Sequence, residues 1–291
     1  MKTENGATAA CENPERIRGR GMLKQRVKAA VIFVPLVLIL IFLGGWAFNL
    51  FIILILLMAA YEYAELFKKM GFIPSLEALL VGVLVLALSR WVFLGQYESV
   101  AFLIVWLVTI LTSLIQYEAG TRDAAVNFAI TLAGVFYIGW VGGFFITLWA
   151  VPDGRGWMLT ALPATWLADS GAYFIGKWLG KRQMTPRLSP NKTWAGYIGA
   201  VLTGTASGLL LVMLWRAVGF LPKETPLWQG LVMGFTLSAL TPVGDLLISL
   251  FKRTAGVKDT SNLIPGHGGI LDRIDTWIWA AMLGYFLVLV F

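Results

Sequence analysis

Nine long apolar runs, separated by short polar connections, dominate this sequence of 291 residues. A helix needs roughly 20 mainly apolar residues to cross a bilayer core about 30 Å thick, and each run comes close to that length. Because 291 residues could also bury a large soluble core, it is the uncharged runs and not the chain length that indicate a membrane protein. The runs are Ala29–Gly45, Trp46–Leu66, Pro74–Leu94, Ser99–Gln116, Ala124–Val151, Gly156–Leu179, Trp194–Phe220, Leu227–Phe251 and Ile270–Phe291.

The composition supports the same class, since only 13% of the residues are charged, whereas soluble domains carry about 25%. The sequence therefore predicts an all-α integral membrane protein with about nine transmembrane helices. The fifth run is long enough to tilt, kink or break at Gly142 and Gly143. A cleaved signal peptide is the alternative for the first run, which follows a basic stretch. We disfavour it because no small-residue cleavage pattern separates the first run from the second.

The distribution of basic residues predicts the orientation in the membrane. With nine helices, 19 of the 23 lysines and arginines fall on the side of the N-terminus, and four fall on the other side: Arg90, Arg155, Arg216 and Lys223. Cytoplasmic loops carry the excess of lysine and arginine, so the N-terminus is expected in the cytoplasm and the C-terminus outside. The net charge of +7 is thereby explained by topology, and no nucleic-acid partner is expected.

Three regions follow from the pattern. Residues 1–26 are polar and basic, and we expect a disordered tail lying against anionic lipid. Residues 27–155 form the N-terminal transmembrane helices, and residues 156–291 form the C-terminal region that carries the candidate chemistry. A single cysteine, Cys11, excludes an internal disulfide.

Acidic residues near the end of the second run allow two interpretations. Glu62 and Glu65 fall on one side of the expected helix and are followed by Lys68 and Lys69. Ion pairs at an interfacial helix end would account for all four residues. Charged groups inside a bilayer also mark functional sites, so a functional role stays open.

The connection after the sixth run has residue types that suit phosphate. Asp169 lies within an apolar run and shares a helix face with Tyr173. The following loop offers Ser189 and Lys192, with Ser-Pro-Asn expected as a turn and Lys-Thr as the start of the next helix. Lysines, hydroxyls and free amides at a helix N-terminus bind phosphate well, although a basic loop with a helix cap is the plainer alternative.

A second group of polar residues surrounds the last connection. Asp245, Ser249 and Lys252 have the spacing of one helix face, and Asp272 and Asp275 share a face at the start of the ninth run. All three carboxylates are expected near the inner side of the membrane. Carboxylate oxygens are ligands for hard cations such as Mg²⁺, and carboxylates beside lysine and arginine are typical of phosphoryl-transfer sites.

Other chemistries fit this sequence less well. Zinc would need histidine and cysteine ligands, but the chain has one of each, Cys11 and His267, far apart. The sequence contains no P-loop motif. It also lacks the G-x-S-x-G elbow of hydrolases with a serine nucleophile. Pro265-Gly-His267-Gly-Gly supplies flexible backbone that could approach phosphate, and His267 has an equally good interpretation as a structural turn residue.

These residues resemble the signature of a known family, the phosphatidate cytidylyltransferases, also called CDP-diglyceride synthases. The resemblance spans Ser249-Leu-Phe-Lys252-Arg253, Lys258-Asp259, Pro265-Gly-His267-Gly-Gly and Asp272-Arg273-Ile-Asp275 with fixed spacing. The segments ADSGAYFIGK and SPNKTWAG are also similar to the family, although Ala195 stands where the family usually has Glu. The similarity is strong over residues 160–291 and weak before them.

The resemblance implies the reaction CTP + phosphatidate → CDP-diacylglycerol + pyrophosphate, with Mg²⁺ as cofactor and a second cation left open. It implies metal binding by three carboxylates: Asp245, Asp272 and Asp275. It also implies that these three and Lys252 are catalytic. Substrate binding falls to a larger set: Asp169, Ser189, Lys192, Ser249, Arg253, Lys258, Asp259, His267 and Arg273. The implied location is the cytoplasmic membrane with the site facing the cytosol, and a homodimer is left open.

Two alternatives remain at this stage. Another CTP-dependent lipid kinase or polyprenol kinase is argued against only by the resemblance. An ion-coupled transporter could use intramembrane carboxylates as relays. Transporters usually show paired halves with broken helices, which the sequence does not display, and would not need phosphate-type loops on one side only.

Overall fold

The computed structural model describes residues 35–261 and 268–291. The expected polar tail, residues 29–34 of the first apolar run and His267 lie outside these residues. After a helix at 35–43, the described chain forms ten further α-helices, one π-helix and one hairpin of two strands. They are α2 (Gly45–Lys69), α3 (Leu76–Phe93), α4 (Glu98–Glu118), α5 (Ala124–Gly134), the π-helix η1 (Val135–Val141), α6 (Phe144–Ala150), α7 (Gly154–Leu179), β1 (Gln183–Thr185), β2 (Ser189–Thr193), α8 (Trp194–Val218), α9 (Leu227–Leu240), α10 (Pro242–Thr254) and α11 (Leu271–Val290).

Seven helical segments of the described chain are long and apolar enough to cross a membrane, so the chain is a helical integral membrane protein. They are Gly45–Lys69, Leu76–Phe93, Glu98–Glu118, Ala124–Ala150, Trp194–Val218, Leu227–Thr254 and Leu271–Val290. They match seven of the nine expected runs. The sixth run is helix α7, which has 26 residues but is diluted by polar and small residues such as Asp169, Ser170 and Gly171. The number nine is therefore not confirmed.

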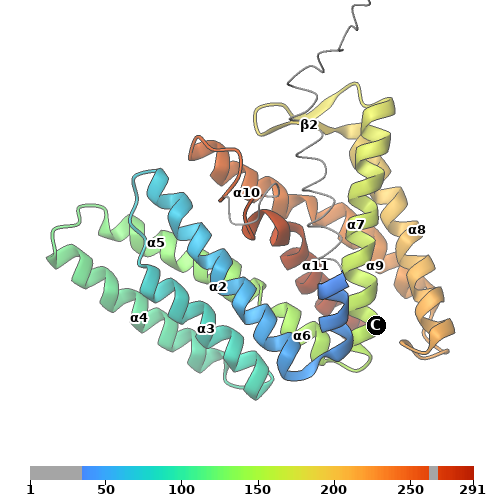
Figure 1. Cartoon of the computed structure of the whole chain (residues 1–291), viewed down its shortest axis with the longest axis horizontal. Coiled ribbons are helices and arrows are strands. Elements are labelled where there is room, and N and C mark those ends of the chain that lie inside the picture. The colour runs from blue at the N-terminus through green and yellow to red at the C-terminus, as the bar shows by residue number, and fades with distance from the viewer. Residues whose placement is uncertain (1–34, 262–267) are drawn as a thin grey trace, which may run out of the picture.

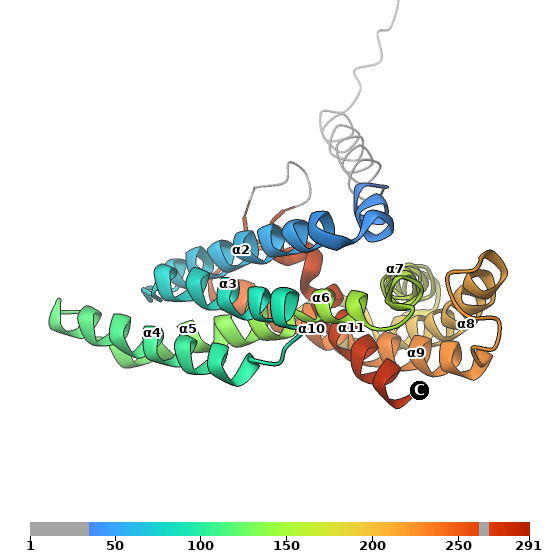
Figure 2. The same ribbon diagram turned by 90° about the horizontal axis from the view of Figure 1, so that it is seen from below.

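The helices form two groups joined by a central pair. Figure 1 shows α2–α5 on one side, α7–α9 on the other, and α10 and α11 between them, and Figure 2 gives the same order from below. Helix α11 contacts α6, α7, α9 and α10, so the last helix lies where the two groups meet. Residues at its start can therefore be reached from both halves of the chain.

Close backbone contact holds α8 against α9. A Cβ atom added at Gly208 would collide with the carbonyl oxygen of Gly230, and one at Gly234 would collide with that of Gly204. Lipid tails are as apolar as leucine, so packing of small residues replaces the hydrophobic effect as the force between such helices. These four glycines let the two backbones touch and set the position of the segment that follows α9.

The expected membrane-spanning segment over 227–251 is present, but it is divided into two helices at Thr241. Helix α9 ends at Leu240, and α10 starts with Pro242 in its first turn. Proline has no N–H to donate and is tolerated at the first helical position, where that N–H would lack a partner anyway. The break places Asp245 in the first turn of a separate helix instead of inside an uninterrupted one.

The fifth run breaks where the sequence predicts. Helix α5 passes into η1, a turn follows at Gly142 and Gly143, and α6 completes the segment. A Cβ atom at Gly142 would collide with the carbonyl oxygen of Ile138, so a side chain there would not fit. A π-helix of this kind often marks a functional site, and it carries Tyr137 toward α11.

The loop after α7 corrects one expectation. The all-α class is confirmed, and the loop adds only a small hairpin in which β1 and β2 pair in antiparallel fashion, with Gln183 opposite Thr193 and Thr185 opposite Ser189. The expected Ser-Pro-Asn turn is wrong, because these residues belong to β2 and the turn covers 186–188. A two-stranded sheet has only edge strands, where a proline such as Pro190 costs little. The expected helix start is confirmed, since the Thr193 hydroxyl accepts a hydrogen bond from the Gly196 amide (3.1 Å).

Candidate active site

Asp272 joins the end of α10 to the start of α11. Its Oδ1 lies 2.5 Å from the ammonium Nζ of Lys252, and the two side chains are only 5% and 12% exposed. Its Oδ2 accepts hydrogen bonds from the Thr260 amide (2.8 Å), the Thr260 hydroxyl (2.8 Å) and the Gly269 amide (3.1 Å). A buried carboxylate needs such partners, and here a cation and three neutral donors supply them.

Asp245 forms a second ion pair, with a residue from the hairpin. Its Oδ2 pairs with the ammonium of Lys192 on β2, and its Oδ1 accepts a hydrogen bond from Ser249 (3.3 Å). The predicted helix face of Asp245 and Ser249 is therefore confirmed, whereas Lys252 turns to Asp272. Arg253 Nε also donates to the carbonyl of Leu188 (3.3 Å). Both contacts tie the hairpin to α10.

A cavity of about 170 Å³ opens beside this ion pair. Asp169, Lys192 and Asp245 all line it, so the structure brings together three residues that are far apart in the sequence. Further polar side chains line it beside apolar ones, among them Tyr173, Asn191, Tyr197 and Thr276. Carboxylates, an ammonium group and hydroxyls around one cavity can bind a phosphorylated molecule together with a cation.

Asp275 is buried behind the cavity, one turn after Asp272. Its Oδ1 accepts from the Thr276 amide (2.7 Å), and its backbone carbonyl accepts from the hydroxyl of Tyr137 (3.4 Å). Gly244, next to Asp245, has no room for a Cβ atom because the Asp275 carbonyl occupies that space. Helices α10 and α11 therefore meet with backbone contact between the two aspartates.

The three aspartates do not form a preassembled metal cluster. Over residues 35–261 and 268–291, no three acidic, histidine or cysteine side chains converge closely enough to hold an ion. The chemistry of the donors nevertheless fits Mg²⁺, because they are carboxylates on two adjoining helices. In this arrangement Lys192 and Lys252 balance the charges of Asp245 and Asp272.

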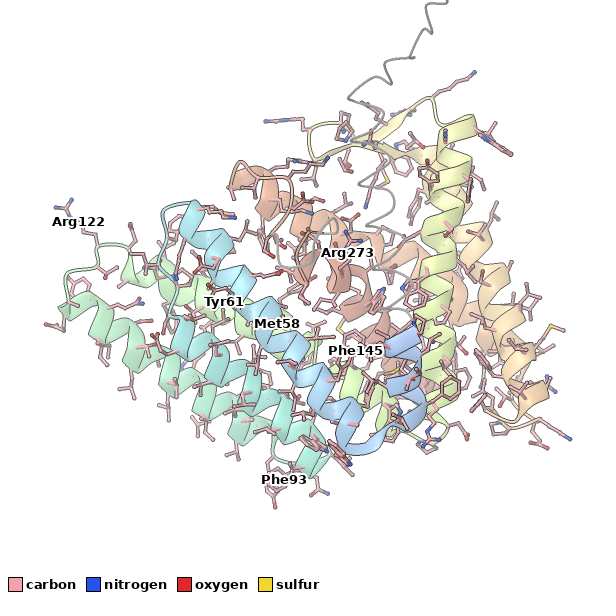
Figure 3. The ribbon with its side chains drawn as sticks, in the orientation of Figure 1. Met58, Tyr61, Phe93, Arg122, Phe145 and Arg273 are labelled. Atoms are coloured by element: carbon pink, nitrogen blue, oxygen red, sulfur yellow. The ribbon has the colours of Figure 1, made fainter. Side chains whose placement is uncertain are left out.

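The remaining predicted residues lie around this centre. Ser189 is half-buried on β2 and does not line the cavity, while Lys258 and Asp259 are exposed after α10. Asp259 lies beside Gly268, close to the Oδ2 atom of Asp272. Arg273 is exposed at the start of α11, and Figure 3 shows it in the middle of the molecule.

The sequence left the role of Glu62 open and did not include it among the candidate site residues. Glu65 and Lys68 form the expected exposed ion pair (2.7 Å), but Glu62 is 1% exposed and turns to the segment before α11. It accepts hydrogen bonds from the hydroxyls of Thr260 (3.1 Å) and Ser261 (2.6 Å). The signal in the sequence was the carboxylate itself, two turns inside an apolar helix. A charged group is costly there and by default indicates a functional site.

Comparison with known proteins covers nearly the whole chain. A sequence profile described as "Cytidylyltransferase family" matches residues 24–291. A phosphatidate cytidylyltransferase of Synechocystis is 32% identical over 296 residues, covering 92% of this chain and 97% of the relative. Enzymes with the same name from Bacillus subtilis and Brucella suis are 34% identical, over 92% and 90% of this chain. The similarity thus includes the N-terminal helices, beyond the signature segments.

Proposed function

Because this chain belongs to the cytidylyltransferase family, we propose that it catalyses the reaction of CTP with phosphatidate to give CDP-diacylglycerol and pyrophosphate. The observation that carries the proposal is the similarity, over 90% or more of the chain, to relatives named for that activity. The chain is then a nucleotidyltransferase of phospholipid biosynthesis in the cytoplasmic membrane, with its site facing the cytosol.

The cavity suits the nucleotide side of this reaction. We infer that the triphosphate of CTP lies near Lys192 and Lys252, with Arg253, Lys258 and Arg273 around the entrance. A phosphate oxygen of the lipid attacks the α-phosphorus, a new P–O bond forms, and the bond from the α-phosphorus to the pyrophosphate oxygen breaks. No covalent enzyme intermediate is needed, since the lipid supplies the nucleophile. The protein mainly aligns two anions and reduces their repulsion.

The lysines have a second role in this proposal. Each now neutralises an aspartate, Lys192 with Asp245 and Lys252 with Asp272. When phosphates enter, both ammonium groups would turn to phosphate oxygens and release the carboxylates. Asp245, Asp272 and Asp275 would then hold Mg²⁺, which supplies charge neutralisation for the phosphates. By this exchange of partners, the lysines and the aspartates would each have a neighbour of opposite charge both before and after the substrate binds.

An apolar cavity on the other side of α10 suits the lipid. It measures about 460 Å³ and is lined by apolar and aromatic residues, among them Tyr63, Tyr137, Leu247, Phe251 and Trp279. The hydroxyl of Tyr137 reaches the carbonyl of Asp275, so this cavity ends beside the catalytic helix start. Acyl chains in it would bring a lipid phosphate toward the aspartates from within the membrane.

Purified protein in lipid nanodiscs tests the proposal directly. Pyrophosphate should appear only when CTP, phosphatidate and Mg²⁺ are all present, together with CDP-diacylglycerol. Release of CDP with phosphorylation of the lipid would instead identify a CTP-dependent kinase. The sequence showed no broken helices, which argued against a transporter, but the structure has a helix break at Thr241, so the transporter alternative also needs a test. Ion flux into liposomes without CTP, and no pyrophosphate with it, would overturn the enzyme assignment.

A further inference from the structure

Glu62 has an unusual position for a carboxylate in a transmembrane helix. It lies on α2, almost 200 residues before the segment that it contacts, and it is buried. Its Oε1 accepts from the Ser261 hydroxyl (2.6 Å) and the Ile270 amide (2.9 Å). Its Oε2 accepts from the Thr260 hydroxyl (3.1 Å) and the Leu271 amide (2.8 Å). These four donors are all neutral groups.

Two of these donors belong to the start of α11. The amides of Ile270 and Leu271 are among the first of the helix, which lack intrahelical partners and carry the positive end of the helix dipole. The other two donors, Thr260 and Ser261, lie between α10 and residue 262, at the other end of the connection that leads to α11. Glu62 therefore holds both ends of one connection, at the point where α11 begins.

The Thr260 hydroxyl links Glu62 to the active site. It lies 3.1 Å from Glu62 Oε2 and 2.8 Å from Asp272 Oδ2. A hydroxyl has one proton, so it can donate to only one of the two carboxylates at a time. Gly269 completes the contact, because a Cβ atom there would collide with Thr260 Oγ1 and Glu62 Oε2. The glycine is thus needed for the close approach of α2.

We propose that Glu62 is a positioning residue for the reaction. From α2 it holds Thr260, Ser261 and the first amides of α11, and thereby fixes the direction in which the Asp272 carboxylate points toward Lys252. It does not itself contact a substrate. This inference rests on the proposed function, and it gives the N-terminal half of the chain a part in a site built by the C-terminal half.

Glu62→Gln tests the proposal with little change of shape. Glutamine offers one acceptor oxygen, and its NH₂ group would face the hydroxyls and amides that now donate. We expect kcat for pyrophosphate release to fall at least about tenfold, while the KM for CTP changes by less than about threefold, as for an interaction needed mainly in the transition state. Glu65→Gln, on the exposed face of the same helix, is the control and should retain the wild-type kcat.

Hydrogen exchange provides a readout that does not depend on activity. In Glu62→Gln the amides of residues 269–272 should exchange faster than in the wild type, whereas Glu65→Gln should not change them. Unchanged exchange would overturn the inference even if the wild type showed no transferase activity, so the two proposals fail separately. Wild-type kcat in Glu62→Gln would overturn it as well.

A second pair of variants applies if Glu62→Gln does not fold. Thr260→Ser keeps the hydroxyl between the two carboxylates, and Thr260→Val removes it at nearly equal size. The serine variant should have at least about fivefold higher kcat than the valine variant, with similar melting temperatures. Equal rates in the two variants would contradict the proposed link between Glu62 and Asp272.

Discussion

The ammonium group of Lys252 lies 2.5 Å from Oδ1 of Asp272, across the junction between α10 and α11. The pair is buried, and it connects the helix that follows the break at Thr241 to the helix at the centre of the fold. Removing one partner from such a pair leaves an uncompensated charge, so each member depends on the other.

The first prediction concerns Asp272. Asp272→Asn keeps the shape but removes the charge that faces Lys252 and, in the proposed reaction, the cation. We expect kcat/KM for CTP to fall at least about 100-fold, which corresponds to about 2.7 kcal/mol in the transition state. Pyrophosphate release measures the effect, and a melting curve in detergent serves as control for folding. Wild-type turnover in this variant would exclude a catalytic role.

The second prediction concerns Lys192 and Asp245, which form one ion pair at the cavity. Lys192→Met and Asp245→Asn should each lower kcat/KM. Because each single variant leaves the charge of the other member of the pair uncompensated, the double variant should lose less kcat/KM than the product of the two single effects. A double-mutant cycle on kcat/KM measures the coupling. Additive effects would show that the ion pair between the two side chains does not influence turnover.

The third prediction concerns the metal. Treatment with EDTA should abolish pyrophosphate release, and Mg²⁺ should restore it, since the site gathers carboxylates and the proposed substrates are polyanions. Asp275→Asn should raise the Mg²⁺ concentration needed for half-maximal rate at least about fivefold. Titration of rate against Mg²⁺ measures this. Full activity in EDTA would contradict the metal requirement.

The fourth prediction concerns packing between α8 and α9. Gly208→Ala adds a Cβ atom where the Gly230 carbonyl lies, so the two backbones must separate. Such overpacking costs about 1–3 kcal/mol, and the melting temperature of the protein in detergent should fall measurably. Leu210→Ala, at an exposed position of the same helix, is the matched control and should have a smaller effect. The reverse order would show that the glycine contact contributes little.

Much of this protein could be predicted from its sequence because bilayer physics acts on local patterns. Apolar length determines helices such as α2, α3, α4 and α8, and the two glycines at 142 and 143 mark the break in the fifth run. The i, i+4 spacing of Asp245 and Ser249 is enough to place them on one face. The signature residues indicate the family, which the comparison of whole chains shows.

Tertiary structure decided the rest. Only the folded chain shows that Lys252 pairs with Asp272, that Lys192 reaches Asp245 from a β-hairpin, and that Glu62 caps α11 from another helix. Local spacing cannot predict these contacts, because each joins residues separated by 20 to 209 positions. A buried charge takes whichever partner the packing of helices brings within reach, and in this chain glycine contacts and a proline break determine that packing.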